Sequence, residues 1–383
     1  MMRKKAVMAL SGGMDSSTLL LRLLRENYDV TAISFDYGQN HKIELERATE
    51  LIEHLKENNQ TLTHQIVQLS SAMNLFESAL LGDSEIPEGH YEEASMKATV
   101  VPNRNAIFAS ILYGTALSLS EKHQCNSVVA LGVHSGDHAI YPDCRPEFYR
   151  ALEHAFSIGN WGSEQVEFVL PYLDDDKIGI LRDGLQSCVE LELEFDEIYV
   201  RTITSYSPDQ DGKSAGTSGS DIERILAFHA IGRRDPIDYV KPWDDVLANA
   251  LNVERAYRDE SYREQLTKLQ YQVTRLQGTE PAFTGQYWNE KRNGNYHCIC
   301  CDTLLFISSM KFDSGCGWPS FHSEHQEANI TRIEDRSHGM LRTEVQCSRC
   351  EAHLGHVFND GPRAFGGERY CINSASMNFL PAE

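Results

Sequence analysis

Cysteines are distributed very unevenly along this chain of 383 residues. Three of the ten are isolated, at Cys125, Cys144 and Cys188, whereas the other seven lie between Cys298 and Cys371. In a reducing compartment such crowding indicates metal binding or thiol chemistry more often than structural disulfides. The distribution therefore predicts two domains of different character.

Length and composition limit the classes of protein that the chain can represent. A chain of 383 residues is long enough for two or three domains, and its 41% hydrophobic and 24% charged content is ordinary for globular proteins. A net charge of -21 disfavours a large nucleic-acid surface, and no apolar run approaches the ~20 residues that span a bilayer. The apolar stretch near the start is too short for a signal peptide. We therefore expect a cytoplasmic protein without membrane contact or direct nucleic-acid binding.

The first part of the chain alternates between two hydrophobic periods. Helical spacing predicts helices over 16–27, 43–58 and 104–123. Apolar, β-branched runs predict strands over 4–10, 29–37, 63–70, 127–134, 166–173 and 197–206. This alternation is typical of a doubly wound α/β fold, in which helices cover both faces of a parallel sheet and ligands bind at the carboxyl ends of the strands.

The alternation fades after residue 239, and the texture of the sequence changes. Residues 240–266 are polar and partly helical, and the later segments are short and rich in Gly, Asn, Cys and aromatic residues. We therefore expect an α/β domain over 1–240, a linker over 241–260 and a small, mainly-β domain over 261–383.

Four cysteines of the second domain form two CxxC pairs, Cys298/Cys301 and Cys347/Cys350. Each pair can direct two thiolates at one ion, and two such pairs complete a tetrahedral zinc site that leaves no position for water. The spacing therefore predicts one structural zinc. The alternative is that one pair is redox-active and the other incidental.

Two further cysteines, Cys316 and Cys371, lie outside the zinc pattern. A nucleophilic cysteine needs a depressed pKa, which nearby positive charge or hydrogen-bond donors supply. Arg369 precedes Cys371 by two residues and shares its face if the segment is a strand, and His353 and His356 are further donors. The pattern favours a thiol site, although an isolated His or Cys belongs to the core more often than to a catalytic site.

Six segments in unbroken order resemble methionine-R-sulfoxide reductases of the MsrB type: GTEPAFTG, YHCICC, KFDSGCGWPSF, HGMLRTEVQC, CEAHLGHVFNDGP and GERYCINSAS. The resemblance implies a β-rich reductase domain in which the four paired cysteines hold a structural zinc. It also implies that Cys371 attacks the sulfoxide sulfur and becomes a sulfenic acid, which Cys316 converts to a disulfide that thioredoxin reduces. Oxidised proteins would be the substrates.

The same resemblance implies roles for further residues of this domain. Trp318 would hold the methyl group of the substrate against its ring. The sulfoxide oxygen would be oriented, and protons delivered, by His353, His356, Asp360 and Arg369.

The first domain contains a glycine-rich turn between a predicted strand and a predicted helix, in the sequence Ser11-Gly12-Gly13-Met14-Asp15-Ser16-Ser17. Inward-turned backbone amides and a helix amino terminus suit phosphate. The GxxxxGK[ST] loop is absent, which disfavours ordinary P-loop hydrolysis. The alternative is a polar turn without a ligand.

SGGMDSS resembles the signature of the ATP pyrophosphatases. Together with FDYGQNH, VPNRNAIF and GVHSGDHAIYPDCRPEF, it makes residues 4–236 similar to 7-cyano-7-deazaguanine synthases of queuosine biosynthesis. The resemblance implies an adenine nucleotide alpha hydrolase-like fold. It also implies ATP- and magnesium-dependent conversion of 7-carboxy-7-deazaguanine and ammonia to the nitrile.

Roles in this domain follow from the matching positions. Arg104 would neutralise phosphate or carboxylate charge, Lys177 would lie near the phosphates, and Asp143 and Arg145 would face the deazapurine. Pyrophosphate and magnesium would be held at the turn by Leu10, Ser11, Gly12, Gly13, Met14, Asp15, Ser16 and Ser17.

One departure from the family pattern concerns a metal site. That family carries four zinc cysteines near the end of its domain, and here the corresponding positions are Ser205, Ala215, Ser218 and Asp221. Such side chains do not hold zinc as thiolates do, so we expect no metal there. Three possibilities stay open: a metal-free loop closes an active site, the domain adenylates another carboxylate, or it only binds or senses a nucleotide.

Overall fold

The structure is a computed structural model that describes residues 4–39, 43–78, 81, 99–139, 141–205, 212–325, 330–336 and 339–382. The chain divides into two compact units, Met1–Glu254 and Arg255–Glu383, which are described separately below. The division falls inside helix α9 (Trp243–Gln265), which occupies most of the expected linker. Several positions of the predicted Ser205-to-Asp221 loop, residues 206–211, lie outside the described residues.

Unit 1 is an α/β unit built on five parallel strands. Its strands are β1 (Lys5–Ala9), β2 (Asp29–Asp36), β3 (Leu62–Gln68), β4 (Ser127–Ala130) and β5 (Val166–Val169). Its helices before α9 are α1 (Met14–Arg25), α2 (Ile43–Glu57), α3 (Ser70–Met73), α4 (Arg104–His123), α5 (Pro146–Gly159), α6 (Lys177–Glu190), α7 (Phe195–Tyr199) and α8 (Gly219–Ala230).

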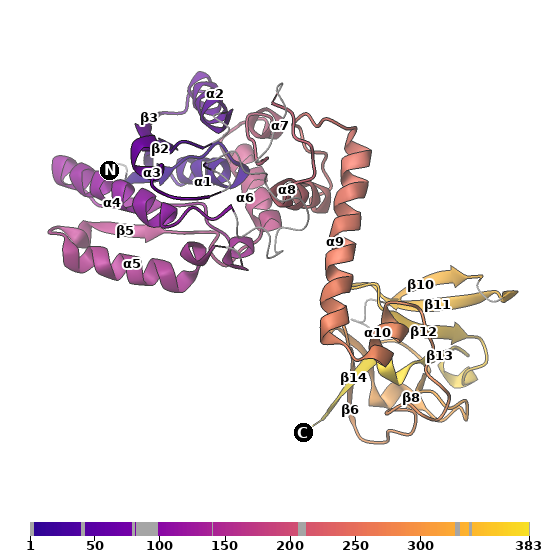
Figure 1. The fold of residues 1–383 in the computed structure, drawn as a ribbon. Coiled ribbons are helices and arrows are strands. Elements are labelled where there is room, and N and C mark those ends of the chain that lie inside the picture. Colours follow the sequence, from indigo (N-terminus) through magenta and orange to yellow (C-terminus); the bar gives the residue numbers. More distant parts are fainter. Residues whose placement is uncertain are drawn as a thin grey trace. The chain divides into compact units, whose positions relative to one another are not determined.

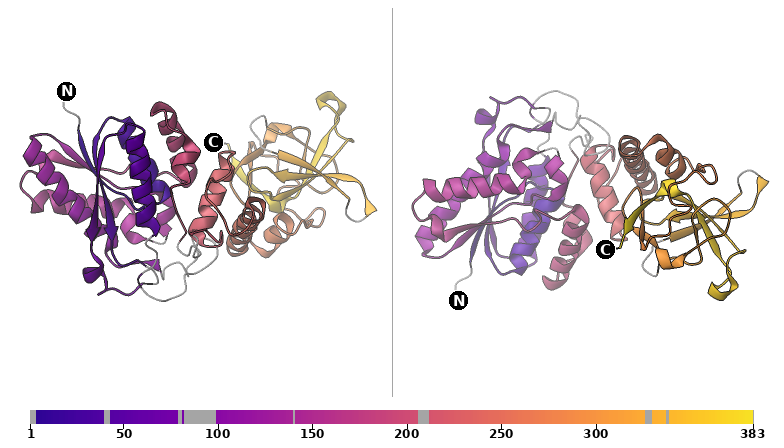
Figure 2. Two further views of the ribbon diagram at one scale, coloured as in Figure 1. Left: turned by 90° about the horizontal axis from the view of Figure 1, so that it is seen from above. Right: turned by 90° about the horizontal axis from the view of Figure 1, so that it is seen from below.

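The strands of unit 1 lie in the order β3-β2-β1-β4-β5. The order reverses at β1, which pairs in parallel with both β2 and β4. Helices cover both faces of the sheet, as the two views of Figure 2 show. The predicted doubly wound parallel sheet is therefore confirmed, and its switch point lies where β1 runs into the glycine-rich turn.

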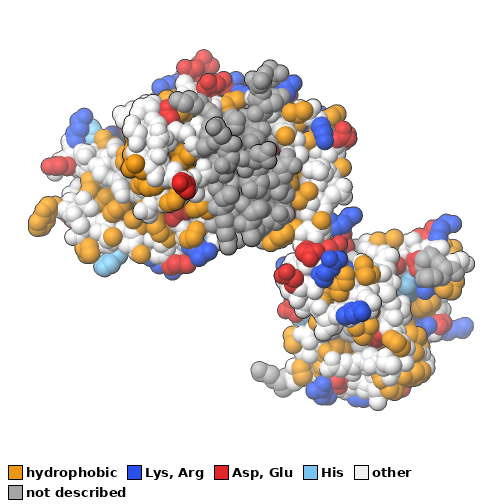
Figure 3. Space-filling view, in the orientation of Figure 1, with side chains coloured by type: hydrophobic (Ala, Val, Ile, Leu, Met, Phe, Trp, Pro, Cys, Tyr) orange, Lys and Arg blue, Asp and Glu red, His pale blue; other side chains and the backbone are white. Residues whose placement is uncertain are grey.

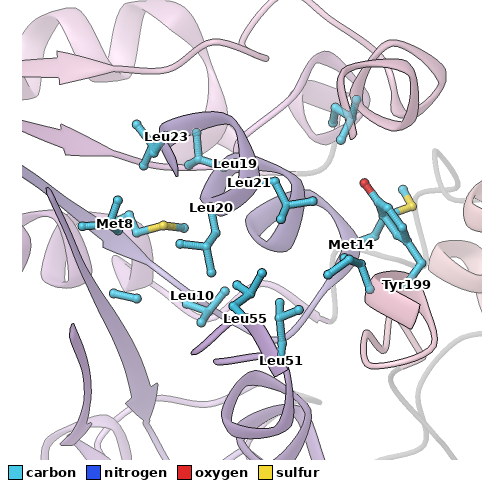
Figure 4. Packing of buried hydrophobic residues seen from close by; sticks show 14 of the residues in the cluster. Met8, Leu10, Met14, Leu19, Leu20, Leu21, Leu23, Leu51, Leu55 and Tyr199 are labelled. Carbon is cyan, nitrogen blue, oxygen red and sulfur yellow. The ribbon is translucent and has the colours of Figure 1, made fainter. Parts of the chain in front are cut away.

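Two apolar cores pack against opposite faces of this sheet, because alternate residues of a strand point to opposite sides. Met8 faces the core formed with α1, α2, α6 and α8, whereas Val7 faces the core formed with α4. Figure 4 shows Leu20 of α1 and Leu51 and Leu55 of α2 gathered around Leu10. The cores fix the helices that flank the turn.

The strand predicted over 197–206 is wrong. Its first residues belong to α7, and the chain after Tyr199 is irregular as far as the structure describes it. Phe195, Ile198 and Tyr199 lie at helical spacing and are buried together, so their packing overrides the β-branched composition that favoured a strand. The strand predicted over 166–173 is shorter, because Pro171 cannot donate a backbone hydrogen bond.

Unit 2 is mainly β, as predicted. After α9 come one short helix, α10 (Lys268–Thr274), and two antiparallel sheets, of order β10-β11-β12-β13-β9-β8 and β14-β6-β7. The strands, labelled where space allows in Figure 1, are β6 (Gly294–Cys298), β7 (Leu304–Ile307), β8 (Lys311–Phe312), β9 (Ser320–Phe321), β10 (Ile330–Asp335), β11 (Arg342–Cys347), β12 (His353–Phe358), β13 (Arg369–Ile372) and β14 (Met377–Pro381).

The core of unit 2 lies between its two sheets. Stacked rings of Phe306 and Phe321, 4.2 Å apart between centroids, join strands β7 and β9. Acidic and basic side chains are interspersed on the face of each unit that Figure 3 shows. None of the helices among the described residues has both the length and the hydropathy that crossing a bilayer requires.

A fully buried ion pair stabilises the part of unit 1 that carries α8. Arg224 donates from Nε and Nη2 to the two carboxylate oxygens of Asp235, at 2.6 and 2.9 Å, and neither side chain is exposed. Further hydrogen bonds join the guanidinium to the hydroxyl of Thr202 and the carbonyl of Tyr199. This network links α8 to the segment that follows α7.

Replacing Arg224 by Met should lower the free energy of unfolding of unit 1 by about 3–5 kcal/mol, because Asp235 would be left buried without a counter-charge. A urea titration monitored by hydrogen-exchange mass spectrometry measures unfolding separately for peptides of each unit. Arg233→Met is the control, since its pair with Asp196 is exposed and should contribute only about 0–1 kcal/mol. Equal effects of the two substitutions would contradict this account.

Candidate functional sites

A cavity of ≈ 220 Å³ lies in unit 1 at the carboxyl ends of β1, β2 and β4. Parallel strands of this sheet all direct their carboxyl ends to one edge, where a ligand meets loops from several of them. The lining comes from the turn after β1, the end of β2, the first turns of α2, α4 and α6, and α8. It includes Leu10, Ser11, Gly13, Asp15, Ser16, Tyr37, Glu44, Arg104, Asn105, Phe108, Asp137, Lys177, Ser220 and Glu223.

The glycine-rich turn is held by its own hydroxyls. The Ser16 hydroxyl accepts the Ser11 N–H at 3.2 Å, and the Gly13 N–H donates to the Ser11 hydroxyl at 3.2 Å. Gly12 has φ +85°, and a Cβ there would lie 2.2 Å from the carbonyl oxygen of Glu44, so the turn packs directly on α2. Gly12, Met14 and Ser17 support the turn from behind and do not line the cavity.

Lys177 and Asp15 form the charged centre of the cavity. The ammonium of Lys177 lies 2.8 Å from Asp15 Oδ2, 3.0 Å from His134 Nε2 and 3.5 Å from Glu223 Oε2. Burial disfavours the charged form of Lys177, but Asp15 and Glu223 outweigh it and raise its pKa above the ordinary range. Burial raises the pKa of Asp15, but the charges of Lys177 and His134 together outweigh burial, so the pKa of Asp15 lies below its ordinary value.

Two carboxylate atoms of this cavity make no hydrogen bond. Asp15 Oδ1 and Glu223 Oε2 are both buried from solvent without a hydrogen-bond partner. Unsatisfied carboxylate oxygens are costly inside a protein, and they are the ligands that Mg²⁺ prefers. The residues present therefore fit a magnesium ion delivered with a nucleotide.

A second wall of the cavity is aromatic and carries one carboxylate. Phe35 and Phe108 stack with centroids 4.1 Å apart, and the Arg104 guanidinium lies 5.9 Å from the ring of Tyr37. Burial raises the pKa of Glu44 to about 7, although Arg104 opposes the shift. Flat rings next to paired charges suit a planar, polar heterocycle.

Asp143 and Arg145 do not line the cavity. The Asp143 carboxylate accepts the backbone N–H of Asn105 at 3.3 Å, which ties the loop of residues 142–144 to the start of α4. Arg145 Nε donates to the carbonyl oxygen of His138 at 2.8 Å. Both side chains hold the loops that border the cavity.

Four positions of this chain correspond to the zinc cysteines of the family, and three of them, Ser205, Ser218 and Asp221, belong to one hydrogen-bonded cluster. The buried carboxylate of Asp221 accepts the hydroxyls of Ser214 and Ser218, each at 2.7 Å, and that of Ser205 at 3.3 Å. Burial raises the pKa of Asp221, and these hydroxyls oppose the shift. Ser218 and Asp221 also form the capping box of α8, the helix that brings Ser220 and Glu223 to the cavity.

In unit 2 the two CxxC pairs come together in space. The four Sγ atoms of Cys298, Cys301, Cys347 and Cys350 lie within 4.8 Å of one another, and the Cys298–Cys350 and Cys301–Cys347 Sγ distances are both 3.6 Å. A tetrahedral zinc with Zn–S bonds of about 2.3 Å has S–S edges of about 3.8 Å. The cluster therefore fits one zinc with no open position.

Cys316 and Cys371 lie side by side, with 3.8 Å between their Sγ atoms. Cys371 is on β13, and Cys316 is in the loop between β8 and β9, whose Ser320 pairs with Cys371. Burial raises the pKa of Cys371 to about 12. Arg369 lowers that pKa, as the sequence suggested, but burial outweighs it, so the expected depressed pKa of this thiol is not found.

Trp318 is held beside the two thiols. Its indole Nε1 donates to the carbonyl oxygen of Glu280 at 2.9 Å. The Glu280 carboxylate in turn accepts the N–H groups of Ser374 and Ala375, directly after β13. Trp318 and the strand of Cys371 are therefore fixed to the same segment.

His353 and His356 lie on one face of β12 because of a β-bulge. Residues three apart in a regular strand point to opposite faces. Here Val345 pairs with Gly355 and Gln346 pairs with His353, so β12 has one extra residue, and the two imidazole centroids are 5.5 Å apart. His356 is directly opposite Cys371 in the pairing of β12 with β13.

The two histidines and Arg369 each have a carboxylate partner. His353 Nδ1 is 2.6 Å from Glu344, and His356 Nε2 is 2.8 Å from Asp335. Arg369 forms two hydrogen bonds with Asp360, at 2.8 and 2.9 Å. The arrangement brings two thiols, two imidazoles and a guanidinium together around β12 and β13.

Comparisons with known proteins assign both units. A family model for the "Queuosine biosynthesis protein QueC" matches residues 5–232, and one for the "SelR domain" matches residues 266–381. The chain belongs to both families. It is therefore a bifunctional fusion of a QueC-type and a SelR-type domain.

Similar curated proteins exist for each half. The QueC-family half is 42% identical over 238 residues to "7-cyano-7-deazaguanine synthase 2" of Colwellia psychrerythraea, covering 62% of this chain and 99% of that protein. It is also 42% identical over 239 residues to "7-cyano-7-deazaguanine synthase" of Pseudoalteromonas translucida, covering 62% and 100%. The SelR-family half is 57% identical over 124 residues to "Peptide methionine sulfoxide reductase MsrB" of Pseudomonas putida, covering 32% and 92%.

The structure adds residues that the sequence did not single out. In the QueC-family unit these are His134, Glu223 and Glu44, and in the SelR-family unit Glu280 and Glu344. His134 lies inside GVHSGDHAIYPDCRPEF, one of the segments that carry the family resemblance, so the sequence indicated its neighbourhood. Glu223 and Glu344 are isolated acidic residues, and only the tertiary fold brings them to a site.

Purified chain should contain one zinc, and Cys347→Ser should lose it, because three remaining thiolates cannot complete the tetrahedral site. Elemental analysis measures zinc per chain, with Cys125→Ser in the QueC-family unit as the control that keeps the metal. Two zincs per chain would contradict a metal-free Asp221 cluster.

Proposed function

We propose that the SelR-family unit reduces peptide-bound methionine-R-sulfoxide in oxidised proteins, with thioredoxin as the reductant. The observation that carries the proposal is the 3.8 Å separation of Cys316 and Cys371 beside Trp318 and the two histidines. A thiol pair at this distance can close into a disulfide after small side-chain movements. The structural zinc would be held by the four paired cysteines.

The reaction balances with the groups of this site. Cys371 Sγ attacks the sulfoxide sulfur and the oxygen passes to Cys371, which gives a sulfenic acid and the released thioether of methionine. Cys316 Sγ then attacks the sulfenic sulfur, water leaves, and a disulfide forms. Thioredoxin returns both thiols by exchange.

The proton for the sulfoxide oxygen can come from Cys371 itself. Because burial holds this thiol protonated in the free site, its proton has to move to the oxygen as the sulfur attacks. His356, opposite Cys371, is placed to carry it, and Arg369 is placed to stabilise the developing negative charge. Trp318 offers an apolar ring for the methyl group.

Cys371→Ser should abolish reduction of methionine-R-sulfoxide, because a hydroxyl does not form the sulfenic acid. Cys316→Ser should release one methionine per chain and then stop under thioredoxin, because no resolving thiol remains. Methionine released per chain, with and without thioredoxin, separates these outcomes. Turnover by the Cys371 variant would refute the assignment, and normal recycling by the Cys316 variant would point to another thiol.

We propose that the QueC-family unit uses ATP to activate 7-carboxy-7-deazaguanine and, with ammonia, forms 7-cyano-7-deazaguanine. The observation that carries this proposal is the cavity at the SGGMDSS turn, where Lys177, Asp15 and two carboxylate oxygens without a hydrogen-bond partner meet an aromatic wall. Ser11, Ser16 and the Gly13 amide would hold the pyrophosphate. Asp15 and Glu223 would hold magnesium, which neutralises phosphate charge when bound.

Activation precedes nitrile formation in this scheme. The substrate carboxylate attacks the α-phosphorus of ATP, pyrophosphate leaves, and ammonia displaces AMP to give the amide. A second ATP then adenylates the amide oxygen with loss of pyrophosphate, and AMP leaves with that oxygen as the amide nitrogen loses its two protons, which gives the nitrile. Lys177 would leave its present carboxylate partners to stabilise the charge that develops on the phosphates.

The Asp221 cluster supports the proposal that this unit is active without a zinc ion of its own. Its hydrogen bonds hold the start of α8, and with it Ser220 and Glu223, at the cavity wall. We propose that this cluster replaces the zinc expected in the family. A sensor that binds without turnover, or a ligase for another carboxylate, are the alternatives that the same assay distinguishes.

Adding 7-carboxy-7-deazaguanine and ammonia to the chain with MgATP should release AMP and pyrophosphate and form the nitrile. Lys177→Met should reduce the rate by about 100-fold, because it removes a fixed positive charge from the cavity. Lys122→Met, on the exposed end of α4, is the matched control. Binding without turnover would favour the sensor, and pyrophosphate release only with other carboxylates would favour the other ligase.

A further inference from the structure

Glu344 is a buried acidic residue on β11, directly opposite His356 and therefore on the face of the sheet that carries His356 and Cys371. It is only 6% exposed, and His353 is its ion-pair partner among the described residues. The carboxylate also accepts the amide of Gln346 at 3.0 Å, with Gln277 at the longer distance of 3.5 Å. Burying a carboxylate without an Arg or Lys partner costs free energy unless hydrogen-bond donors next to it stabilise its charge.

The contact with Glu344 determines which nitrogen of His353 carries the proton. An ionised carboxylate only accepts hydrogen bonds, so at a distance of 2.6 Å Nδ1 must be the donor. In the neutral ring the lone pair then lies on Nε2. That atom is buried without a hydrogen-bond partner, on the face where His356 stands opposite Cys371.

We propose that Glu344 is a positioning residue of the reductase site, which fixes His353 as the Nδ1–H tautomer and keeps the Nε2 lone pair available to the His356–Cys371 pair. The inference rests on the proposed reductase function. During reduction Nε2 accepts the proton that leaves the Cys371 thiol by way of His356, and the proton returns to the sulfoxide oxygen. No proton is gained or lost in the cycle.

A purely structural role for Glu344 is the competing explanation. Such a role would change the stability of unit 2 but not the tautomer of His353 or the pH profile of the reaction. The groups that act on His353 are Glu344, His356 and Asp335, besides its burial. Burial lowers the pKa of His353, and Glu344 raises it, so removing the Glu344 charge should lower the pKa further.

Glu344→Gln tests the proposal in the full-length, zinc-loaded chain. The glutamine amide can also donate to Nδ1, so both tautomers become accessible. The single-turnover rate of methionine release should fall at least ten-fold at neutral pH, with KM changed less than two-fold. The rise of that rate with pH, which follows deprotonation of His353, should move to lower pH.

Glu334→Gln, at an exposed position of the neighbouring strand β10, is the matched control and should leave rate and profile unchanged. Glu344→Asp keeps the charge and should restore part of the rate. Zinc content and thermal unfolding report whether each variant is folded. A folded Glu344→Gln variant with the rate and profile of the unchanged chain would overturn the proposal.

The ¹⁵N chemical shifts of His353 in the unchanged chain give a test that needs no variant. They should identify the Nδ1–H tautomer, and the Nε2–H tautomer would overturn the proposal. Absence of reductase activity in the unchanged chain would instead refute the proposed function, so the two failures are distinguishable.

Discussion

Burial of charge is the constraint on which both halves of this chain depend. Each unit removes charged groups from water, and the cost of doing so is recovered only where a partner lies within hydrogen-bonding distance. In unit 1 Arg224 is enclosed with Asp235, and Lys177 is enclosed with Asp15. In unit 2 the same requirement joins His353 to Glu344. These pairs fix the elements that carry the site residues.

The two units use different chemistry to hold a loop together. In unit 2 four cysteines gather at distances that suit a zinc ion, at the ends of β6 and β11 and in the turns that follow them. In unit 1 the Asp221 carboxylate gathers serine hydroxyls instead, at the start of α8. Zinc binding by such a cluster requires deprotonated thiols, whereas hydrogen bonds to a carboxylate are strong only while they stay buried.

The reductase site is asymmetric in the way it treats its two thiols. Cys371 lies deeper, and burial raises its pKa, whereas hydroxyl groups around Cys316 outweigh burial and lower the pKa of that thiol. The Cys371 thiol is therefore held as a neutral group, with His356 directly opposite it. A site of this kind suits a reaction in which attack on sulfur and protonation of oxygen occur together.

The sequence alone predicted the α/β and mainly-β classes and the gathering of the four paired cysteines, both of which the structure shows. Those features depend on local periodicity and on the fixed spacing of CxxC pairs, which short stretches of chain contain completely, whereas the roles of Cys316 and Cys371 were implied by the resemblance to a family. It predicted a strand over 197–206, because it could not show that Ile198 and Tyr199 pack as a helix against the core.

Only the tertiary structure decided which side chains share a site. It excluded Asp143 and Arg145 from the cavity lining, and it brought Glu223 to that lining from α8. A bulge in β12 placed His353 and His356 on one face, and the register of β11 placed Glu344 opposite His356 and within 2.6 Å of His353. The glycine-rich turn of unit 1 and the cysteine pattern of unit 2 specify where chemistry occurs. The partners that tune it are set by strand register and burial, because these depend on contacts between residues far apart in the sequence.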